Sequence, residues 1–315
     1  MRTLIEGFLC VWIICLAYTH IAEAQDSCSG RCGSRLDRRR SCQCSTTRPR
    51  DPISTRDISH LAREVWVADV NRVPGSLYAL SRQTKIRRIY HYRDRSPRRL
   101  FTSLEPSILD GETYATLRAL LNNYHRSVGV EENTTPRENQ EIEAFLDAIL
   151  NTDVMRLTYD LLFRKGYFST PSAFRDYLKS TWFDLYARSK GQRVLDSSAF
   201  EHTFVGEIKN GRVTGFHNWL QFYLQELAGN LNYYGYTKTS QPNQILLQFN
   251  WHSRVKVMSS VMVGVSPEFE MALFTVCFIA QPGQMCSFNL NGNRVSVRTY
   301  VHGGTKLGAA YFHVH

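Results

Sequence analysis

The hydrophobic pattern of the chain changes its period near residue 197, and this change restricts the fold more than any other feature. Before that point, apolar residues recur three and four positions apart, which is typical of amphipathic helices. Helices are predicted over 54–71, 113–124, 137–150, 153–164 and 172–187. After it, short β-type runs are separated by Asn-Gly and Pro-Gly turns. Strands are predicted over 203–208, 212–216, 245–249, 255–263, 286–290 and 295–301.

One helix is expected to interrupt these strands. Ser266 suits an N-cap and Pro267 the first helical position, so a helix should begin there and end near Gln281. The predicted fold class is therefore α+β, with a helical N-terminal half packed on C-terminal antiparallel β-sheets.

The first 53 residues differ from the rest. Residues 1–24 combine a basic start, a short apolar run and a small-residue cleavage site, which predicts a secretory signal peptide rather than a membrane anchor. Residues 25–53 are polar and cysteine-rich, and such a short segment needs cross-links because it cannot bury a core. Residues 54–315 form the predicted main domain. Its apolar runs are too short for a transmembrane segment, so we expect a secreted, extracellular protein.

Six cysteines remain after the predicted signal peptide is removed. An even number in a secreted chain favours disulfides over metal thiolates. The candidates are Cys28, Cys32, Cys42, Cys44, Cys277 and Cys286. Cys277 and Cys286 could pair across the intervening Pro-Gly turn, and two free buried thiols are the equal alternative. Asn133 begins an Asn-Thr-Thr glycosylation acceptor.

The segment 200–219 carries the pattern most suggestive of chemistry. A two-residue turn at Asn210-Gly211 between regular strands would place His202 and His217 on one face, about 7–8 Å apart. One neutral and one protonated imidazole at that separation can act as base and acid on a bound phosphodiester. Lys256, on a later strand, could supply the fixed cation that a phosphorane needs. The alternatives are structural histidines or a zinc site, for which no characteristic spacing is present.

Several blocks in this region resemble the EndoU family, the uridylate-specific endoribonucleases. The blocks are Phe200-Glu-His202, Val205-Gly-Glu207, Gly215-Phe-His-Asn-Trp-Leu-Gln-Phe-Tyr223 and Ser266-Pro-Glu-Phe-Glu270. The resemblance extends over residues 54–315. In addition, Ser27-Cys-Ser-Gly-Arg-Cys32 resembles the opening half of a somatomedin-B module, which is truncated here.

The resemblance implies cleavage of RNA at uridylates by His202, His217 and Lys256, leaving a 2′,3′-cyclic phosphate and a 5′-hydroxyl. It implies His217 as the base, His202 as the acid, and assistance by manganese (Mn²⁺) with ligands that the sequence does not identify. Glu201 and Glu207 match acidic positions of the motif. Regular strand alternation would turn both away from the histidine face, which favours a supporting role in substrate binding.

The resemblance is incomplete at the expected uracil pocket. The family's Gly-Thr-Ala-Tyr-Pro is replaced by Gly308-Ala-Ala-Tyr311-Phe, so Ala309 stands where a hydroxyl is usual. Tyr311 remains available to orient a base or ribose, and Ser260 could provide a hydroxyl instead. A preference for uridine would therefore have to come from Tyr311 and Ser260.

The formal net charge of +10 favours polyanionic partners. We expect single-stranded RNA as the partner of a monomeric enzyme, with other polyanions as further ligands. Basic and aromatic residues interleave over 82–99, as in an RNA track, although a solvated basic loop is the alternative. The alternative function is a secreted RNA-, polyanion- or matrix-binding protein with a degenerate catalytic fold.

Overall fold

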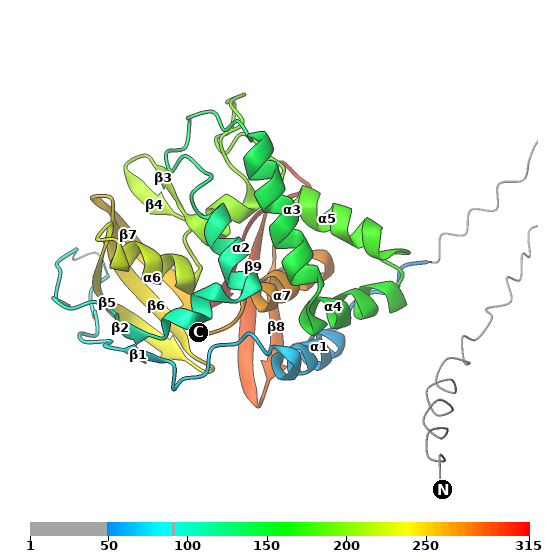
Figure 1. Cartoon of the computed structure of the whole chain (residues 1–315), viewed down its shortest axis with the longest axis horizontal. Coiled ribbons are helices and arrows are strands. Elements are labelled where there is room, and N and C mark those ends of the chain that lie inside the picture. Colours follow the sequence, from blue (N-terminus) through cyan, green and yellow to red (C-terminus); the bar gives the residue numbers. More distant parts are fainter. Residues whose placement is uncertain (1–48, 90–91) are drawn as a thin grey trace, which may run out of the picture. The chain divides into compact units, whose positions relative to one another are not determined.

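The N-terminal half is helical, as predicted. The computed structural model describes residues 49–89 and 92–315 (Figure 1), so the predictions for residues 1–48, including Cys28, Cys32, Cys42 and Cys44, lie outside the described residues. The helices are α1 (Thr55–Ala68), α2 (Glu112–Leu120), α3 (Pro136–Leu150), α4 (Asp153–Arg164) and α5 (Pro171–Phe183), with a 3₁₀ turn over Pro106–Asp110. Capping side chains fix several starts. Ser54 and Asp57 form a capping box before α1, and Thr135 and Glu138 form one before α3.

The described part of the chain also contains four antiparallel sheets. One contains β5 (Leu231–Ser240), β6 (Gln244–Trp251) and β7 (Arg254–Met262) in that order. Another contains β8 (Met285–Leu290), β9 (Asn293–His302) and β10 (Lys306–His313), with β9 in the middle. Two-stranded sheets pair β1 (Tyr78–Leu80) with β2 (Phe101–Leu104), and β3 (Glu207–Lys209) with β4 (Arg212–Thr214). The predicted α+β class is confirmed.

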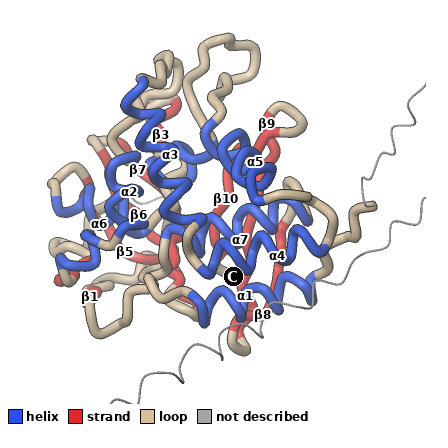
Figure 2. Tube along the Cα trace, turned by 45° about the vertical axis from the view of Figure 1, so that its right-hand side comes forward, coloured by secondary structure: helices blue, strands red, loops and turns tan. Residues whose placement is uncertain are grey.

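The core is centred on α7 (Pro267–Ala280), which is buried along nearly its whole length. It packs against α1 and α4 on one side and against β9 and β10 on the other, and Figure 2 shows it among these elements. Ser266 caps it by accepting a hydrogen bond from the Phe269 N–H at 3.1 Å, as predicted. Cys277, on this helix, forms a disulfide with Cys286 on β8. These two cysteines are therefore paired and are not free buried thiols.

The strand predicted over 203–208 is largely wrong. Residues Glu201–Val205 form a π-helical turn, and only β3 from Glu207 onward is extended. The reason is aromatic packing. Phe200 and Phe204 lie one helical turn apart and stack at 4.9 Å between ring centroids. In an extended strand the same four residues would span about 13 Å, too far for the rings to stack. Gly206, at φ 96°, then turns the chain into β3.

Other elements were not predicted either. Asn218 caps a second interrupting helix, α6 (Trp219–Leu227), by accepting from the Gln221 N–H at 2.9 Å. Strands β1, β2, β5 and β10 also lacked a clear sequence signal; in β10, Gly308, Ala309 and Ala310 are weak strand formers. Asn133 is exposed in the loop before α3, and its glycosylation stays a prediction. No helix among the described residues is long and apolar enough to cross a membrane.

Candidate active site

A cavity of about 540 Å³ opens where β4, β7 and β10 meet the π-helical turn. Both β4 and β10 pack against β7, which brings the three sheets together at this point. Six of the residues discussed from the sequence line the cavity: His202, His217, Lys256, Ser260, Ala309 and Tyr311. Glu201 and Glu207 lie behind its wall and are completely buried. Segments more than one hundred residues apart in sequence therefore supply one site.

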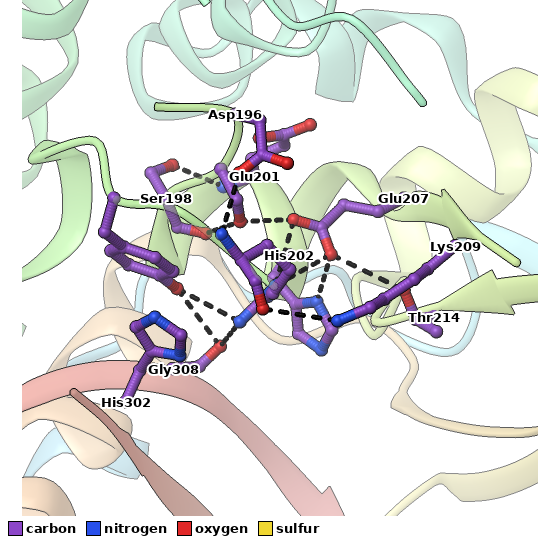
Figure 3. Close-up of polar contacts among 12 residues, drawn as sticks. Asp196, Ser198, Glu201, His202, Glu207, Lys209, Thr214, His302 and Gly308 are labelled. Carbon is purple, nitrogen blue, oxygen red and sulfur yellow. Dashed lines mark hydrogen bonds and ion pairs between the residues drawn. The ribbon is translucent and has the colours of Figure 1, made fainter. Parts of the chain in front are cut away.

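His202 is held by Glu207. Its Nδ1 lies 2.6 Å from Glu207 Oε2, and Figure 3 shows the ring and the carboxylate directed at each other. Burial would raise the pKa of Glu207, but His202, Arg188 and Ser197 together lower it to about 2. The carboxylate is therefore ionised, so Nδ1 must carry a proton and donate it. The prediction that Glu207 points away from the histidines is wrong. Its side chain points toward His202 because the π-helical turn and Gly206 break the strand alternation.

The predicted hairpin is shorter than expected, yet it still joins the two histidines. Asn210-Gly211 forms the predicted turn, with Lys209 opposite Arg212. Beyond β4, the Phe216 N–H donates to the His202 carbonyl at 2.9 Å, and the His217 N–H donates to the Thr203 carbonyl at 2.7 Å.

This approach requires glycine at position 215. A Cβ at Gly215 would lie 1.8 Å from the His202 carbonyl oxygen, and the residue has φ 62°. Phe216 also has a positive φ of 66°, a strained conformation that its packing against Phe249 and Trp251 maintains. The backbone that joins His202 to His217 is thus fixed by close contacts rather than by a regular β-ladder.

His217 has a defined tautomer. Its Nδ1 lies 3.2 Å from the Ser260 carbonyl oxygen and 3.2 Å from Ser259 Oγ, whose own proton goes to the Phe216 carbonyl. Both neighbours accept, so Nδ1 carries the proton and the lone pair of the neutral ring lies on Nε2. Burial, Lys256 and His202 all lower the pKa of His217 well below its usual range, which keeps the ring neutral.

Lys256 and Arg188 are the basic side chains that line the cavity. Lys256 lies on β7 and is 8% exposed. Burial lowers its pKa to about 7, and Glu207 opposes that shift. Burial, together with Arg188 and Lys256, lowers the pKa of His202 to about 4, against the opposing effect of Glu207. The three groups therefore act electrostatically on one another within a single cavity.

Tyr311 and Ser260 complete the lining on either side of His217. The Tyr311 ring stacks on the His217 ring, with centroids 4.3 Å apart and planes 14° apart. The Ser260 hydroxyl is buried in the cavity wall and has no hydrogen-bond partner among the described residues. Ala309 also lines the cavity. A methyl group therefore stands in the cavity wall at the position where the resemblance predicts a threonine hydroxyl.

Comparison with known proteins identifies the family of this chain. Residues 57–312 match the family described as Endoribonuclease XendoU. The chain belongs to the XendoU family. It is 36% identical to the uridylate-specific endoribonuclease of Bos taurus over 90% of this chain and 75% of that one. It is 40% identical to poly(U)-specific endoribonuclease-B of Xenopus laevis over 81% and 92%. The predicted resemblance to EndoU-type endoribonucleases is thereby confirmed.

A solved member of the XendoU family has the same fold. The structure described as "XendoU: a splicing independent snoRNA processing endoribonuclease" matches with a TM-score of 0.70 and 40% sequence identity. The match covers 81% of this chain and 95% of that one. The somatomedin-B-like segment, before residue 49, stays a prediction.

Sequence reasoning missed Arg188 in this XendoU chain. Its Nε donates to Glu207 Oε2 at 3.0 Å, and its Nη1 donates to the Gly308 carbonyl at 2.9 Å. The residue thus joins the carboxylate behind His202 to the strand that carries Tyr311. It lies in the irregular loop after α5, where neither periodicity nor a turn motif distinguishes it from a solvated arginine.

The carboxyl group of Glu201 stands apart from the hydrogen-bond network of the site. It is fully buried, and neither carboxyl oxygen has a hydrogen-bond partner among the described residues. Burial, followed by the charge of Glu207, raises its pKa well above the usual range, so it is a neutral acid. It faces away from the cavity, and direct contact with substrate would require the chain to rearrange.

The residues around the cavity do not fit a protein-held manganese ion. Within residues 49–89 and 92–315, no group of three or more His, Cys, Asp or Glu side chains is placed to hold a metal. The nearest ionised carboxylate, Glu207, is already engaged by His202, Arg188 and Ser197. Manganese assistance stays a prediction, and no step below depends on it.

Proposed function

We propose that this XendoU-family endoribonuclease cleaves single-stranded RNA after uridine by attack of the 2′-hydroxyl on the adjacent phosphate. The observation that carries the proposal is that His202, His217 and Lys256 line one cavity. The 2′-oxygen forms a bond to phosphorus as the bond to the 5′-oxygen breaks. The products are a 2′,3′-cyclic phosphate and a 5′-hydroxyl.

His217 acts as the general base in this proposal. Its Nδ1 proton is engaged by Ser259 and Ser260, so Nε2 is the free basic nitrogen. The lowered pKa keeps this nitrogen unprotonated at neutral pH. It can therefore accept the 2′-hydroxyl proton as the new bond forms.

His202 acts as the general acid and gives its proton to the leaving 5′-oxygen. The ionised Glu207 on Nδ1 favours the protonated ring, as an anionic partner does for any imidazolium. In the free cavity burial outweighs this effect. A bound phosphodiester adds a negative charge beside the ring and raises the pKa again, so substrate binding itself charges the acid. Lys256 stabilises the extra negative charge that develops on the phosphorane.

The uridine preference rests on Ser260 and Tyr311. The unpartnered Ser260 hydroxyl can accept from the N3–H of uracil, a donor that cytosine lacks, or donate to a uracil carbonyl. Leaving such a buried group unpaired costs about 1–3 kcal/mol, so a base that satisfies it is preferred. Ala309 contributes no such group, and the discrimination therefore depends on Ser260.

We also propose that the protein is secreted. Support comes from the predicted signal peptide, from the disulfide between Cys277 and Cys286, and from the exposed acceptor at Asn133. Mass measurement of protein from the medium of expressing cells, before and after removal of N-glycans, tests cleavage near residue 24 and modification of Asn133 together. Retention inside the cell with residues 1–24 attached would refute it.

Cleavage of labelled oligonucleotides that each contain one U, C or A tests the activity, with and without manganese. The wild type should cut at U, and His202→Ala and Lys256→Ala should lose about 10²–10⁴-fold in rate. His60→Ala, which removes an exposed imidazole from α1, is the matched control and should cut like the wild type. Binding of RNA without cleavage by the wild type would instead support the degenerate binding protein.

A further inference from the structure

A second groove of about 310 Å³ lies beside the turn that joins β3 to β4. Its polar and aromatic side chains are Tyr92, Arg212, Arg254 and Ser253, and the rest of its lining is Gly211, Val255 and Val257. No acidic residue lines it. Its surface thus offers two positive charges and an aromatic ring.

The two arginines of this groove are free to bind an anion. Both are exposed, and within the described residues neither guanidinium forms an ion pair. Within the described residues, the one hydrogen bond that the Arg254 side chain makes is from Nη1 to the carbonyl oxygen of its neighbour Ser253, at 3.3 Å. A guanidinium without a carboxylate partner keeps its planar set of donors available for phosphate oxygens.

The groove and the catalytic cavity are lined by neighbouring residues of the same two strands, β4 and β7. On β7, Arg254 precedes Lys256 by two residues, so their side chains share a face at about 6.6 Å spacing. The pairing of this stretch with β6 is regular from Arg254 to Lys256. On β4, Arg212 stands in the same relation to Thr214, which lines the cavity. A strand of RNA with one phosphate at Lys256 therefore meets these arginines within one or two nucleotides.

Tyr92 is placed to contact a base in this groove. Its side chain is 42% exposed, which is high for a large aromatic residue. The segment that follows it is anchored to β5, because Asn232 donates to Asp94 at 2.9 Å and the Ser96 hydroxyl donates to the Tyr234 carbonyl at 3.2 Å. Exposed aromatics among basic side chains are how proteins hold single strands without reading their sequence.

We propose that this groove binds the RNA that flanks the cleaved uridine, with Arg212 and Arg254 on backbone phosphates and Tyr92 against a base. The inference rests on the proposed function and extends it: the enzyme holds several nucleotides rather than one. It also makes affinity for RNA depend on length and on salt, because each phosphate contact releases counterions.

Binding of non-cleavable oligonucleotides tests this independently of catalysis. The probes are a trinucleotide and a dodecanucleotide, each with 2′-deoxyuridine at the single cleavage position, followed by fluorescence anisotropy between 50 and about 300 mM salt. In Arg212→Ala/Arg254→Ala, the dodecanucleotide should bind about tenfold more weakly, and the slope of log affinity against log salt should fall by about 1.4. Arg212→Lys/Arg254→Lys should keep the slope.

The control is Arg56→Ala/Arg63→Ala on α1, which removes the same charge from another surface. It should leave the preference of the wild type for the longer probe intact. Tyr92→Ala should weaken binding of the dodecanucleotide without changing the salt slope. Equal losses in the two double variants, or no loss in the groove variant, would overturn the proposal. A wild type that shows the length dependence but cuts no RNA would refute the proposed function and leave this inference standing.

Discussion

The Tyr311 ring stacks on one face of the His217 ring, with centroids 4.3 Å apart and planes 14° apart, while Nδ1 at the edge of that imidazole donates to the Ser260 carbonyl. The proposed base is therefore clamped between β10 and β7. Because a shift of about 1 Å in a catalytic group can cost roughly 10²-fold in rate, this clamp should matter for turnover.

Two substitutions of Tyr311 distinguish the contribution of its stacked ring to turnover from that of its hydroxyl. Tyr311→Phe keeps the ring against His217 and loses only the hydroxyl, which lies 3.5 Å from that of Tyr300. We expect Tyr311→Ala to lower kcat about tenfold to a hundredfold, and Tyr311→Phe to lower it far less. Steady-state kinetics on an oligonucleotide with one uridine measure both. An equal loss of kcat in the two variants would show that the Tyr311 hydroxyl, and not ring stacking, supports turnover.

The charge of Lys256 should control anion binding near neutral pH. Burial lowers its pKa to about 7, so the protonated form that attracts an anion is lost as pH rises through that value. Affinity for uridine 2′,3′-cyclic phosphate, a monoanion throughout, should weaken by roughly tenfold per pH unit above pH 7. Titration calorimetry from pH 6 to pH 9 measures this. In Lys256→Arg the charge persists, and the dependence should largely vanish.

Much of this site was accessible from sequence, and the reason is local chemistry. Three short-range signals agree with the structure: the Asn210-Gly211 turn, the cap at Ser266 and the spacing of apolar residues in the helices. The π-helical turn at His202 was not accessible, because it depends on Phe200 and Phe204 stacking in a core built from distant helices. Arg188 was missed for the same reason. Its partners, Glu207 and Gly308, are defined only by the folded chain.

The pair of His202 and Glu207 predicts a shift in the pH dependence of turnover. Glu207 raises the pKa of His202, so Glu207→Gln should lower it and move the alkaline limb of the kcat profile to lower pH. The rate at neutral pH should fall about 10–100-fold, as when the carboxylate partner of a functional histidine is removed. A melting curve controls for loss of folding, since Arg188 is left without its partner. A lower rate with an unmoved profile would contradict the role given to Glu207.

Glu270 should make stability depend on alkaline pH. It lies at the start of α7, buried against Asn218, which donates to it at 2.7 Å. Burial raises its pKa to about 8, against the opposing effect of Asn218. The stability that its protonated form provides is present below the unfolded pKa and is lost as pH rises through about 8. Glu270→Gln keeps an acceptor for Asn218 and cannot ionise.

We therefore expect the Tm of Glu270→Gln to exceed that of the wild type most at pH 8.5 and least at pH 5. Thermal melts at both values measure the difference. A constant offset between the two proteins at all pH values would show that folding does not raise the pKa of Glu270, and would contradict this prediction.

The central claim is that His202 protonates the leaving 5′-oxygen while His217 removes the 2′-hydroxyl proton. A substrate whose bridging 5′-oxygen is replaced by sulfur tests it most directly, because a thiolate leaves without needing an acid. We predict that His202→Ala cleaves this substrate within about tenfold of the wild type, whereas His217→Ala stays inactive. Rescue of His217→Ala, or no rescue of His202→Ala, would contradict the account.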